Sequence, residues 1–189
     1  ALIGCGARGP GLMNDCFGIP FAEITAVCDL RSDRAEALAE RVVKAGRPKP
    51  AVISGTEKSW ESLCERDDVD VVYIATPWDW HVPMCLRVME QGKHAFVEVA
   101  AAVTVDDCWQ LVNTSERTQR HCVMLENCCY GENELFVLNL ARAGVLGELQ
   151  ALARRTGQAD ELARRLARHF VGQMRLVGNL AHINTISQS

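Results

Sequence analysis

The residues best suited to chemistry begin in the turn GCGARG, residues 4–9, which lies between an apolar stretch and a helix-compatible segment. The turn fits G-x-G-x-x-G, and Asp29 ends the next apolar stretch about 20 residues later, the spacing found in dinucleotide-binding folds. In such a turn Gly4 permits the tight bend, Gly6 lets the backbone approach a pyrophosphate, and Gly9 lets the helix pack on the sheet. This context predicts a dinucleotide site.

The choice of dinucleotide depends on Asp29 and Arg31. A carboxylate at the end of the second strand accepts hydrogen bonds from the adenosine ribose hydroxyls and repels a 2′-phosphate. Arg31 is close enough in sequence to favour NADP, but the carboxylate comes first. We therefore expect NAD as the cofactor, with NADP as the alternative.

Two further motifs follow predicted strands, at positions that would face the cofactor. TPWDWH, residues 76–81, contains two tryptophans that could form a wall beside the nicotinamide or a sugar. FVEVAAA, residues 96–102, places Glu98 at the end of the next strand, where ligands bind in open α/β sheets. The alternatives are that His81 only begins a helix and that Glu98 is a surface residue.

MLENCCYG, residues 124–131, places Cys128 and Cys129 between an amide and a phenol. The chain has nine cysteines, which are scattered through apolar stretches without the paired spacing of a zinc site. We therefore favour buried, reduced thiols over a vicinal disulfide or a metal site, and we predict no metal. Asn127 and Tyr130 are the better candidates for chemistry in this motif.

Strand-like and helix-like segments alternate along the chain, which predicts a Rossmann-type, doubly wound parallel α/β sheet. Strands are predicted at 1–4, 22–29, 70–76, 94–99 and 121–126, with a short one within 47–55. Helices are predicted up to residue 17 and at 31–46, 59–66, 81–92, 104–119 and 132–144. Ser59 and Thr104 are the expected N-caps. The expected inner stripe of the 31–46 helix is Ala37, Leu38, Arg41, Val42 and Ala45.

Composition argues against several classes of protein. The net charge of −4 gives no reason to expect nucleic acid as a partner. No apolar run reaches the roughly 20 residues that cross a bilayer, and no signal peptide is visible. Because the sequence opens inside a strand, we expect that the true N-terminus is missing. The localisation therefore stays open between the bacterial cytoplasm and the periplasm.

Together these motifs resemble the glucose–fructose oxidoreductase-like (Gfo/Idh/MocA) superfamily, and within it glycoside hydrolase family 109, the NAD-dependent α-N-acetylgalactosaminidases. The resemblance rests on the glycine turn, ATPWDWH, KHAFVEVAAAVT and HCVMLENCCYGENELFVLNLARAGVLGEL, and it covers residues 1–149. It implies that Tyr130 reaches the substrate, an N-acetylgalactosaminide-like sugar. The cofactor positions that it implies are Arg8, Gly9, Asp29, Trp78, Asp79, Trp80, His81, Glu98, Val99 and Asn127.

The resemblance also implies a reaction. Bound NAD would take a hydride from C3 of the sugar, which acidifies the C2 proton; the C1 substituent would leave, water would add, and the hydride would return. Many sugar dehydrogenases of the superfamily carry Glu-Lys-Pro, whose lysine assists proton transfer, where this chain has Glu98-Val99-Ala100. Val99 cannot move a proton, which weakens the alternative of an NAD-dependent sugar dehydrogenase. Ala100 departs from both the dehydrogenase pattern and the Glu-Val-Pro of the hydrolases.

The end of the chain departs from the family pattern. The family's Gly-Asn-Leu-Tyr-Pro-Thr-His segment at the sugar is matched only in part by GNLAHINTISQS, residues 178–189. An Ala/Arg/Leu-rich stretch begins at Gln150, and we hypothesise a frameshift or assembly error near codon 150, with a genuine short variant as the alternative.

We expect residues 1–125 to form the NAD-binding domain. Residues 126–189 would form a truncated or aberrant start of a C-terminal α/β substrate domain, so that catalysis by this short chain would be impaired. A non-catalytic NAD-binding fragment is therefore a third hypothesis. Association into a homo-oligomer would cover apolar faces that a missing domain leaves exposed.

Overall fold

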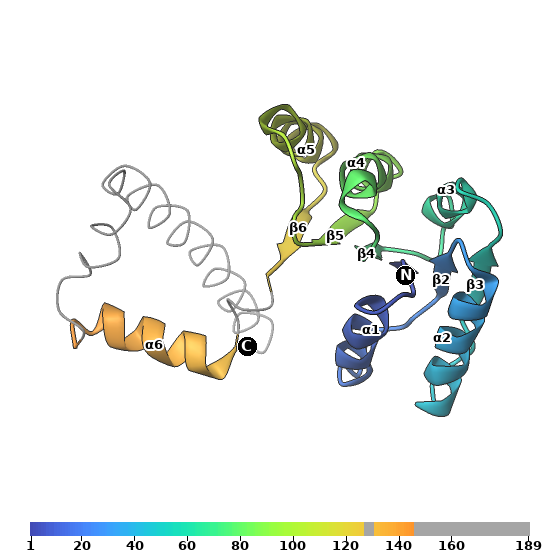
Figure 1. Ribbon diagram of the computed structural model, residues 1–189, viewed down its shortest axis with the longest axis horizontal. Helices are drawn as coiled ribbons and strands as arrows, with labels where there is room; N and C mark the ends of the chain where they lie inside the picture. The colour runs from blue at the N-terminus through green and yellow to red at the C-terminus, as the bar shows by residue number, and fades with distance from the viewer. Residues whose placement is uncertain (127–130, 146–189) are drawn as a thin grey trace, which may run out of the picture. The chain divides into compact units, whose positions relative to one another are not determined.

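The computed structural model describes residues 1–126 and 131–145. The chain divides into two units, Ala1–Asn127 and Cys128–Ser189, and each is described by itself. The first unit is a parallel sheet with helices on both faces (Figure 1). This confirms the prediction of a Rossmann-type, doubly wound α/β fold. The predictions for the stretch from Gln150 onward lie outside the described residues.

Six strands form the sheet in the order β3-β2-β1-β4-β5-β6, and every neighbouring pair is parallel. The chain runs from β1 outward to β3 and then returns to the other side of β1 to begin β4. In open α/β sheets this reversal leaves a crevice at the carboxyl ends of the two central strands, where ligands bind. The strands are β1 (Leu2–Ile3), β2 (Ala26–Asp29), β3 (Ala51–Ser54), β4 (Val71–Ile74), β5 (His94–Glu98) and β6 (Cys122–Leu125).

Helices cover the two faces of the sheet unequally: α1 and α2 lie on one face, and α3, α4 and α5 lie on the other (Figure 1). One turn of 3-10 helix, η1, precedes α4 where a loop was expected. The elements are α1 (Gly9–Phe17), α2 (Ser32–Lys44), α3 (Ser59–Cys64), η1 (Trp78–Trp80), α4 (His81–Glu90) and α5 (Val105–Thr118).

Alternation along the strands divides the core into two layers. Leu2 and Val27 pack with Met13 and Leu38 of the α1/α2 face. Their neighbours in the strands, such as Ile3, pack with α3, α4 and α5 on the opposite face. Successive strand residues point to opposite faces, so both layers arise from the same short strands. A fully buried Leu, Met or Val side chain contributes about 1.5–3 kcal/mol, and both faces contain several of them.

The prediction of the inner stripe of α2 is wrong at three of its five positions. Ala37, Arg41 and Ala45 are exposed. A helix buries positions at intervals of three and four residues, and the stripe that faces the sheet starts two residues earlier than we expected. The residues that it buries are Ala35, Leu38, Ala39 and Val42.

One of the two expected helix caps is confirmed. Thr104 caps α5, and its Oγ1 accepts a hydrogen bond from the backbone N–H of Asp107 at 3.1 Å. Ser59 is not a cap, because α3 already includes it and Lys58 occupies the N-cap position. The Ser59 hydroxyl instead accepts a hydrogen bond from the backbone N–H of Thr56, at 3.0 Å, and holds the loop that precedes α3.

The described part of the second unit is one helix, α6 (Glu132–Arg142). Gly144 follows it with φ +73°, a left-handed conformation that ends helices and favours glycine. The predicted helix and its stop at Gly144 are both confirmed. In the two described ranges, no helix combines the length and the apolar character needed to cross a membrane.

Two histidines meet where β5 and β6 begin. The His94 and His121 rings lie with centroids 5.0 Å apart, and Nδ1 of His94 accepts the backbone N–H of His121 at 3.0 Å. Burial lowers the pKa of His94, and the nearby His121 and Arg120 lower it further, whereas Asp70 opposes them. The folded protein therefore favours neutral His94.

We predict that this pair makes stability depend on pH. Because the pKa of His94 is lowered in the fold, its contribution is complete above the unfolded value, about 6.5, and is lost as the pH falls through the folded value. His94→Asn keeps an acceptor for the N–H of His121 but does not ionise. Thermal unfolding between pH 7.5 and 5.5 should show a steeper loss for the wild type, and parallel curves would contradict the prediction.

Candidate cofactor site

The glycine turn lies between β1 and α1, with backbone packed against backbone. Gly4 has φ +96°, and a Cβ there would overlap the carbonyl oxygen of Ala75 at the end of β4. A Cβ on Gly9 would overlap the carbonyl oxygen of Gly4. Gly6 is different, because the nearest atom to its Cβ position is a side-chain nitrogen of Arg34 at 3.6 Å. Gly4 and Gly9 are therefore needed for packing, whereas Gly6 leaves one backbone surface open to a ligand.

Asp29, at the end of β2, holds this turn in place. Its Oδ2 accepts the backbone N–H of Cys5 at 2.8 Å, and its Oδ1 accepts the backbone N–H of Arg31 at 2.9 Å. An ionised carboxylate has about four acceptor positions, so both oxygens can still accept further hydrogen bonds. Asp29 therefore orders the phosphate-facing turn and remains able to bind ribose hydroxyls.

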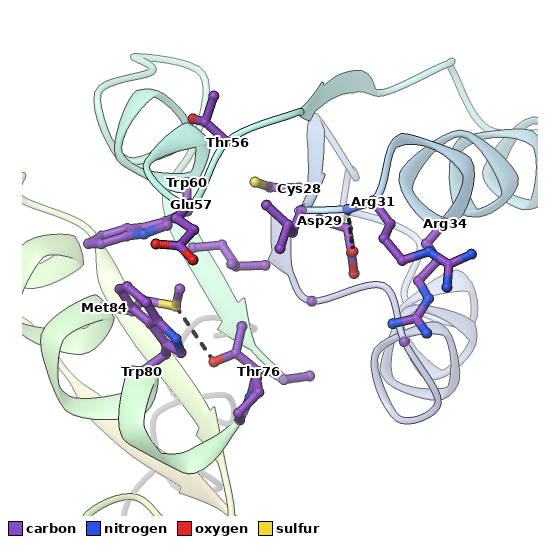
Figure 2. Close-up of a pocket in the computed structure, with 16 residues that line it drawn as sticks. Cys28, Asp29, Arg31, Arg34, Thr56, Glu57, Trp60, Thr76, Trp80 and Met84 are labelled. Atoms are coloured by element: carbon purple, nitrogen blue, oxygen red, sulfur yellow. Dashed lines mark hydrogen bonds between the residues drawn. The ribbon is translucent and has the colours of Figure 1, made fainter.

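A cavity of about 320 Å³ opens at this point of the sheet. Figure 2 shows its side chains in two groups, with Asp29, Arg31 and Arg34 on one side and Trp60, Trp80 and Met84 on the other. We call these the charged end and the aromatic end. A ligand that fills both ends must carry polar or anionic groups at one end and a flat apolar group at the other.

The two arginines of the charged end differ in their partners. Arg31 donates to both carboxylate oxygens of Asp33, at 3.1 and 2.6 Å, and this pairing lowers the pKa of Asp33. Arg34 has no such ion pair in the part of the chain that the structure describes. Its guanidinium lies next to the open surface of Gly6, and is available to an anionic ligand.

The aromatic end is built by three elements. Trp60 of α3 and Trp80 of η1 meet edge to face, with centroids 6.4 Å apart and planes at 67°. Met84 of α4 completes this end, and its sulfur accepts a hydrogen bond from the Thr76 hydroxyl at 3.6 Å. Trp60 is buried, whereas Trp80 is 38% exposed and presents its ring to the cavity. Aromatic and thioether groups of this kind suit a planar ring.

An ion pair joins the glycine turn to the end of β5. The Nε–H of Arg8 donates to Oε1 of Glu98 at 2.7 Å, and the Glu98 side chain is only 14% exposed. Arg8 precedes the first residue of α1, and the positive end of a helix dipole attracts anions. Its remaining guanidinium N–H groups can bind a phosphate while Glu98 fixes the side chain.

His81 begins α4 and is fully buried. Its Nδ1 lies 2.7 Å from the carbonyl oxygen of Ala100, and its Nε2 lies 2.8 Å from that of Thr76. The ring therefore connects the loop after β4 to the loop after β5. It is not among the side chains that line the cavity, so its place in this structure is behind the site.

The remaining candidates from the sequence are distributed as follows. Gly4, Gly6, Asp29 and Trp80 line the cavity together. Trp78, Asp79 and Val99 are exposed and do not line it. Asn127 and Tyr130, like Cys128 and Cys129, lie outside the described residues.

Sequence reasoning missed several lining residues. Thr56 and Glu57 lie in the loop after β3, two and three residues beyond its last residue, and the rule that ligands bind at the carboxyl ends of parallel strands could have identified them. Trp60 and Met84 gave no such signal, because their contribution depends on how α3 and α4 pack on the sheet. Arg34 is one helical turn beyond Arg31 and could have been found from that spacing.

The cysteines near the site are unsuited to thiol chemistry. Burial, together with the smaller effect of the nearby Asp29 carboxylate, raises the pKa of Cys5 and of Cys28 to about 12. The thiolate is the reactive and metal-binding form, and it is scarce at neutral pH when the pKa is this high. The expectation of buried thiols is confirmed at five of the seven described cysteines, but Cys108 is exposed and Cys122 is half-buried.

These features fit a dinucleotide cofactor: an open glycine surface before a helix, the Arg34 guanidinium beside it, a carboxylate at the second strand and a cavity with an aromatic end. The family model of the NAD-binding Rossmann-fold oxidoreductases matches residues 1–126. The chain belongs to the Gfo/Idh/MocA oxidoreductase family. NAD is therefore its cofactor, as the sequence predicted.

Curated relatives support the more specific resemblance. The chain is 50% identical over 147 residues to glycosyl hydrolase family 109 protein 1 of Shewanella sp. (strain ANA-3), and 52% identical to that of Bacteroides thetaiotaomicron. It is 48% identical to an α-N-acetylgalactosaminidase of Shewanella oneidensis. Each match covers 78% of this chain and 32% of the relative, so the chain spans about a third of the length of these proteins.

Solved structures of the Gfo/Idh/MocA type share the fold. A 3-ketoreductase from Actinomadura kijaniata, solved with NADP, is similar with a TM-score of 0.65 and 25% identity, covering 78% of this chain and 44% of that one. An NAD-binding oxidoreductase from Klebsiella pneumoniae has a TM-score of 0.62 and 24% identity, covering 78% and 39%.

We predict that Gly6→Ala lowers NAD affinity without loss of stability. The added methyl group has room in the folded protein, but it occupies the surface that faces the phosphates. Because hydrogen bonds to charged groups would be lost, affinity should fall about 10-fold or more. Calorimetric titration with NAD and thermal unfolding test this together. Gly18→Ala adds a methyl group at the far end of α1, outside the cavity and in ordinary contact with the Asp15 carbonyl; it is the control and should keep wild-type affinity.

We predict that Asp29→Asn shifts the preference from NAD toward NADP. The amide oxygen can still accept the N–H of Cys5 in the turn, although the bond from the N–H of Arg31 is lost. The substitution also removes the charge that repels a 2′-phosphate, and Arg34 is available to bind that phosphate. The ratio of NAD to NADP affinity should fall by about 10-fold or more. Titrations of both cofactors against both proteins measure the ratio. An unchanged ratio would show that Asp29 does not set this choice.

Proposed function

We propose that this chain supplies the cofactor-binding part of an NAD-dependent glycosidase that hydrolyses α-N-acetylgalactosaminides. The observation that carries the proposal is the identity of about 50% over 147 residues to proteins named as family 109 glycosyl hydrolases. We assign residues 1–125 to cofactor binding and residues 126–189 to the start of a substrate domain. Because the chain spans about a third of these relatives, the reaction belongs to the whole protein.

The described residues would act on the cofactor more than on the sugar. When bound, NAD can accept a hydride and later return it. Asp29 would orient the ribose, Gly6 and Arg8 the pyrophosphate, and Glu98 would hold Arg8 toward it. Holding the reactive end of a cofactor against its substrate in this way removes much of the entropic barrier to reaction. Tyr130 and Asn127 remain the candidates for contacts nearer the sugar.

The residue after Glu98 separates this proposal from its nearest alternative. Dehydrogenases with Glu-Lys-Pro have a lysine at this position that can transfer a proton. Here it is Val99, which is 40% exposed at the end of β5 and has no ionisable group. In either reaction the hydroxyl group that loses a hydride must also lose its proton, and this chain lacks the lysine that the Glu-Lys-Pro dehydrogenases use to assist that transfer. This difference favours the glycosidase over the sugar dehydrogenase.

We expect the glycosidase to release free sugar without consuming NAD. The protein is incubated with NAD and the 4-nitrophenyl α-glycoside of N-acetylgalactosamine, while free sugar and the absorbance of NADH are followed together. Free sugar should accumulate with no net change in NADH. Accumulation of NADH in proportion to substrate would instead identify a dehydrogenase. Cofactor binding with neither product would identify a non-catalytic NAD-binding module.

A further inference from the structure

We propose that Glu57 recognises the 6-amino group of the cofactor's adenine and that Trp60 and Trp80 form the wall against which this base lies. Neither Glu57 nor Trp60 belongs to the motifs that indicated a dinucleotide. The proposal rests on the NAD site and is independent of the glycosidase reaction.

The chemical difference between the charged end and the aromatic end decides which half of NAD the cavity suits. Asp29 and the open surface of Gly6 lie at its charged end, and these groups suit the adenosine ribose and the pyrophosphate. The aromatic end lies in the same cavity, beyond Asp29 as seen from the arginines (Figure 2). The group attached to that ribose on its other side is adenine, so the aromatic end is the place for the base.

This placement assigns Trp80 a role other than a wall for the nicotinamide or a sugar. Trp80 shares its cavity with Asp29, and its ring is held by the edge-to-face contact with Trp60. Trp60 is held in turn by burial in the core between α3 and the sheet. A pre-positioned aromatic surface stabilises a stacked base, by about 1–3 kcal/mol in known cases.

Glu57 is the one carboxylate that lines the aromatic end. It lies in the loop after β3 and lines the cavity, and Figure 2 shows its carboxylate turned toward the space bounded by Trp60, Trp80 and Met84. Among the described residues, it takes part in none of the five ion pairs. An ionised carboxylate only accepts hydrogen bonds, so its complement is a donor at the edge of the base.

The 6-amino group distinguishes adenine from the related base hypoxanthine. Adenine carries two N–H donors at this position, whereas hypoxanthine carries an oxygen with only lone pairs. The amino group of adenine can donate a charge-assisted hydrogen bond to Glu57. The oxygen of hypoxanthine carries partial negative charge, so the Glu57 carboxylate repels it. The carboxylate therefore makes the site selective for adenine dinucleotides.

The test compares NAD with nicotinamide hypoxanthine dinucleotide, in which that oxygen replaces the amino group. Both are titrated against wild-type protein and Glu57→Gln, with quenching of tryptophan fluorescence as the measure of binding and no sugar present. The wild type should bind NAD about 10-fold or more tightly than the hypoxanthine analogue. Glutamine can accept from adenine and donate to hypoxanthine, so the variant should bind the two within about threefold.

Matched controls separate this role from general effects of charge or folding. Glu57 is exposed, so its conversion to an amide should leave the unfolding temperature unchanged. Glu40→Gln removes an exposed carboxylate on α2 outside the cavity and should keep the full preference for NAD. Equal affinities in the wild type, or a preference that survives in Glu57→Gln, would overturn the proposal. The same titrations measure whether the wild type binds NAD at all. Absence of NAD binding would contradict the cofactor site itself, and this result differs from both outcomes that would overturn the role of Glu57.

Discussion

The first turn of the chain passes so close to its neighbours that side chains are excluded at two positions. At Gly4 the obstacle is the carbonyl of Ala75, and at Gly9 it is the carbonyl of Gly4 itself. This contact brings the end of β1 against the end of β4, where the order of the strands reverses. The carboxylate of Asp29 can then reach the backbone of the same turn from β2. The crevice and the surfaces in it that suit a phosphate and a ribose all depend on this backbone packing.

The two ends of the cavity differ in charge and in apolar character, and this difference determines how a ligand is oriented in the site. Arginines, the Asp29 carboxylate and bare backbone lie at one end, and aromatic rings, a thioether and the Glu57 carboxylate lie at the other. An anion is poorly accommodated by the aromatic end, because nothing there replaces its lost hydration. A flat base gains little at the charged end, where water already surrounds the guanidinium groups. These differences favour one orientation of a nucleotide over the other.

The sequence allowed prediction of those features that depend on local spacing. The glycine turn, Asp29, Glu98 and the alternation of strands and helices could be located because each follows from neighbours within one strand–helix unit. The inner stripe of α2 was misplaced, since small alanines mark both its faces and only packing on the sheet shows which are covered. Trp60 and Met84 join the site through the docking of separate helices, and no interval along the chain encodes that contact. His81 was recognised as part of a motif, but its two carbonyl partners became visible only in three dimensions.

The buried ring of His81 has a consequence for the thermodynamics of ligand entry. Its ring nitrogens lie 2.8 and 2.7 Å from the carbonyl oxygens of Thr76 and Ala100, at least one of which accepts a ring N–H, so the ring helps to hold the loops after β4 and β5 before any ligand arrives. Ordering a flexible residue costs roughly 1–2 kcal/mol in conformational entropy. Here that cost is met when the polypeptide folds, so association does not have to include it. Affinity then depends on the contacts formed and on displaced water, with little contribution from rearrangement of these two loops.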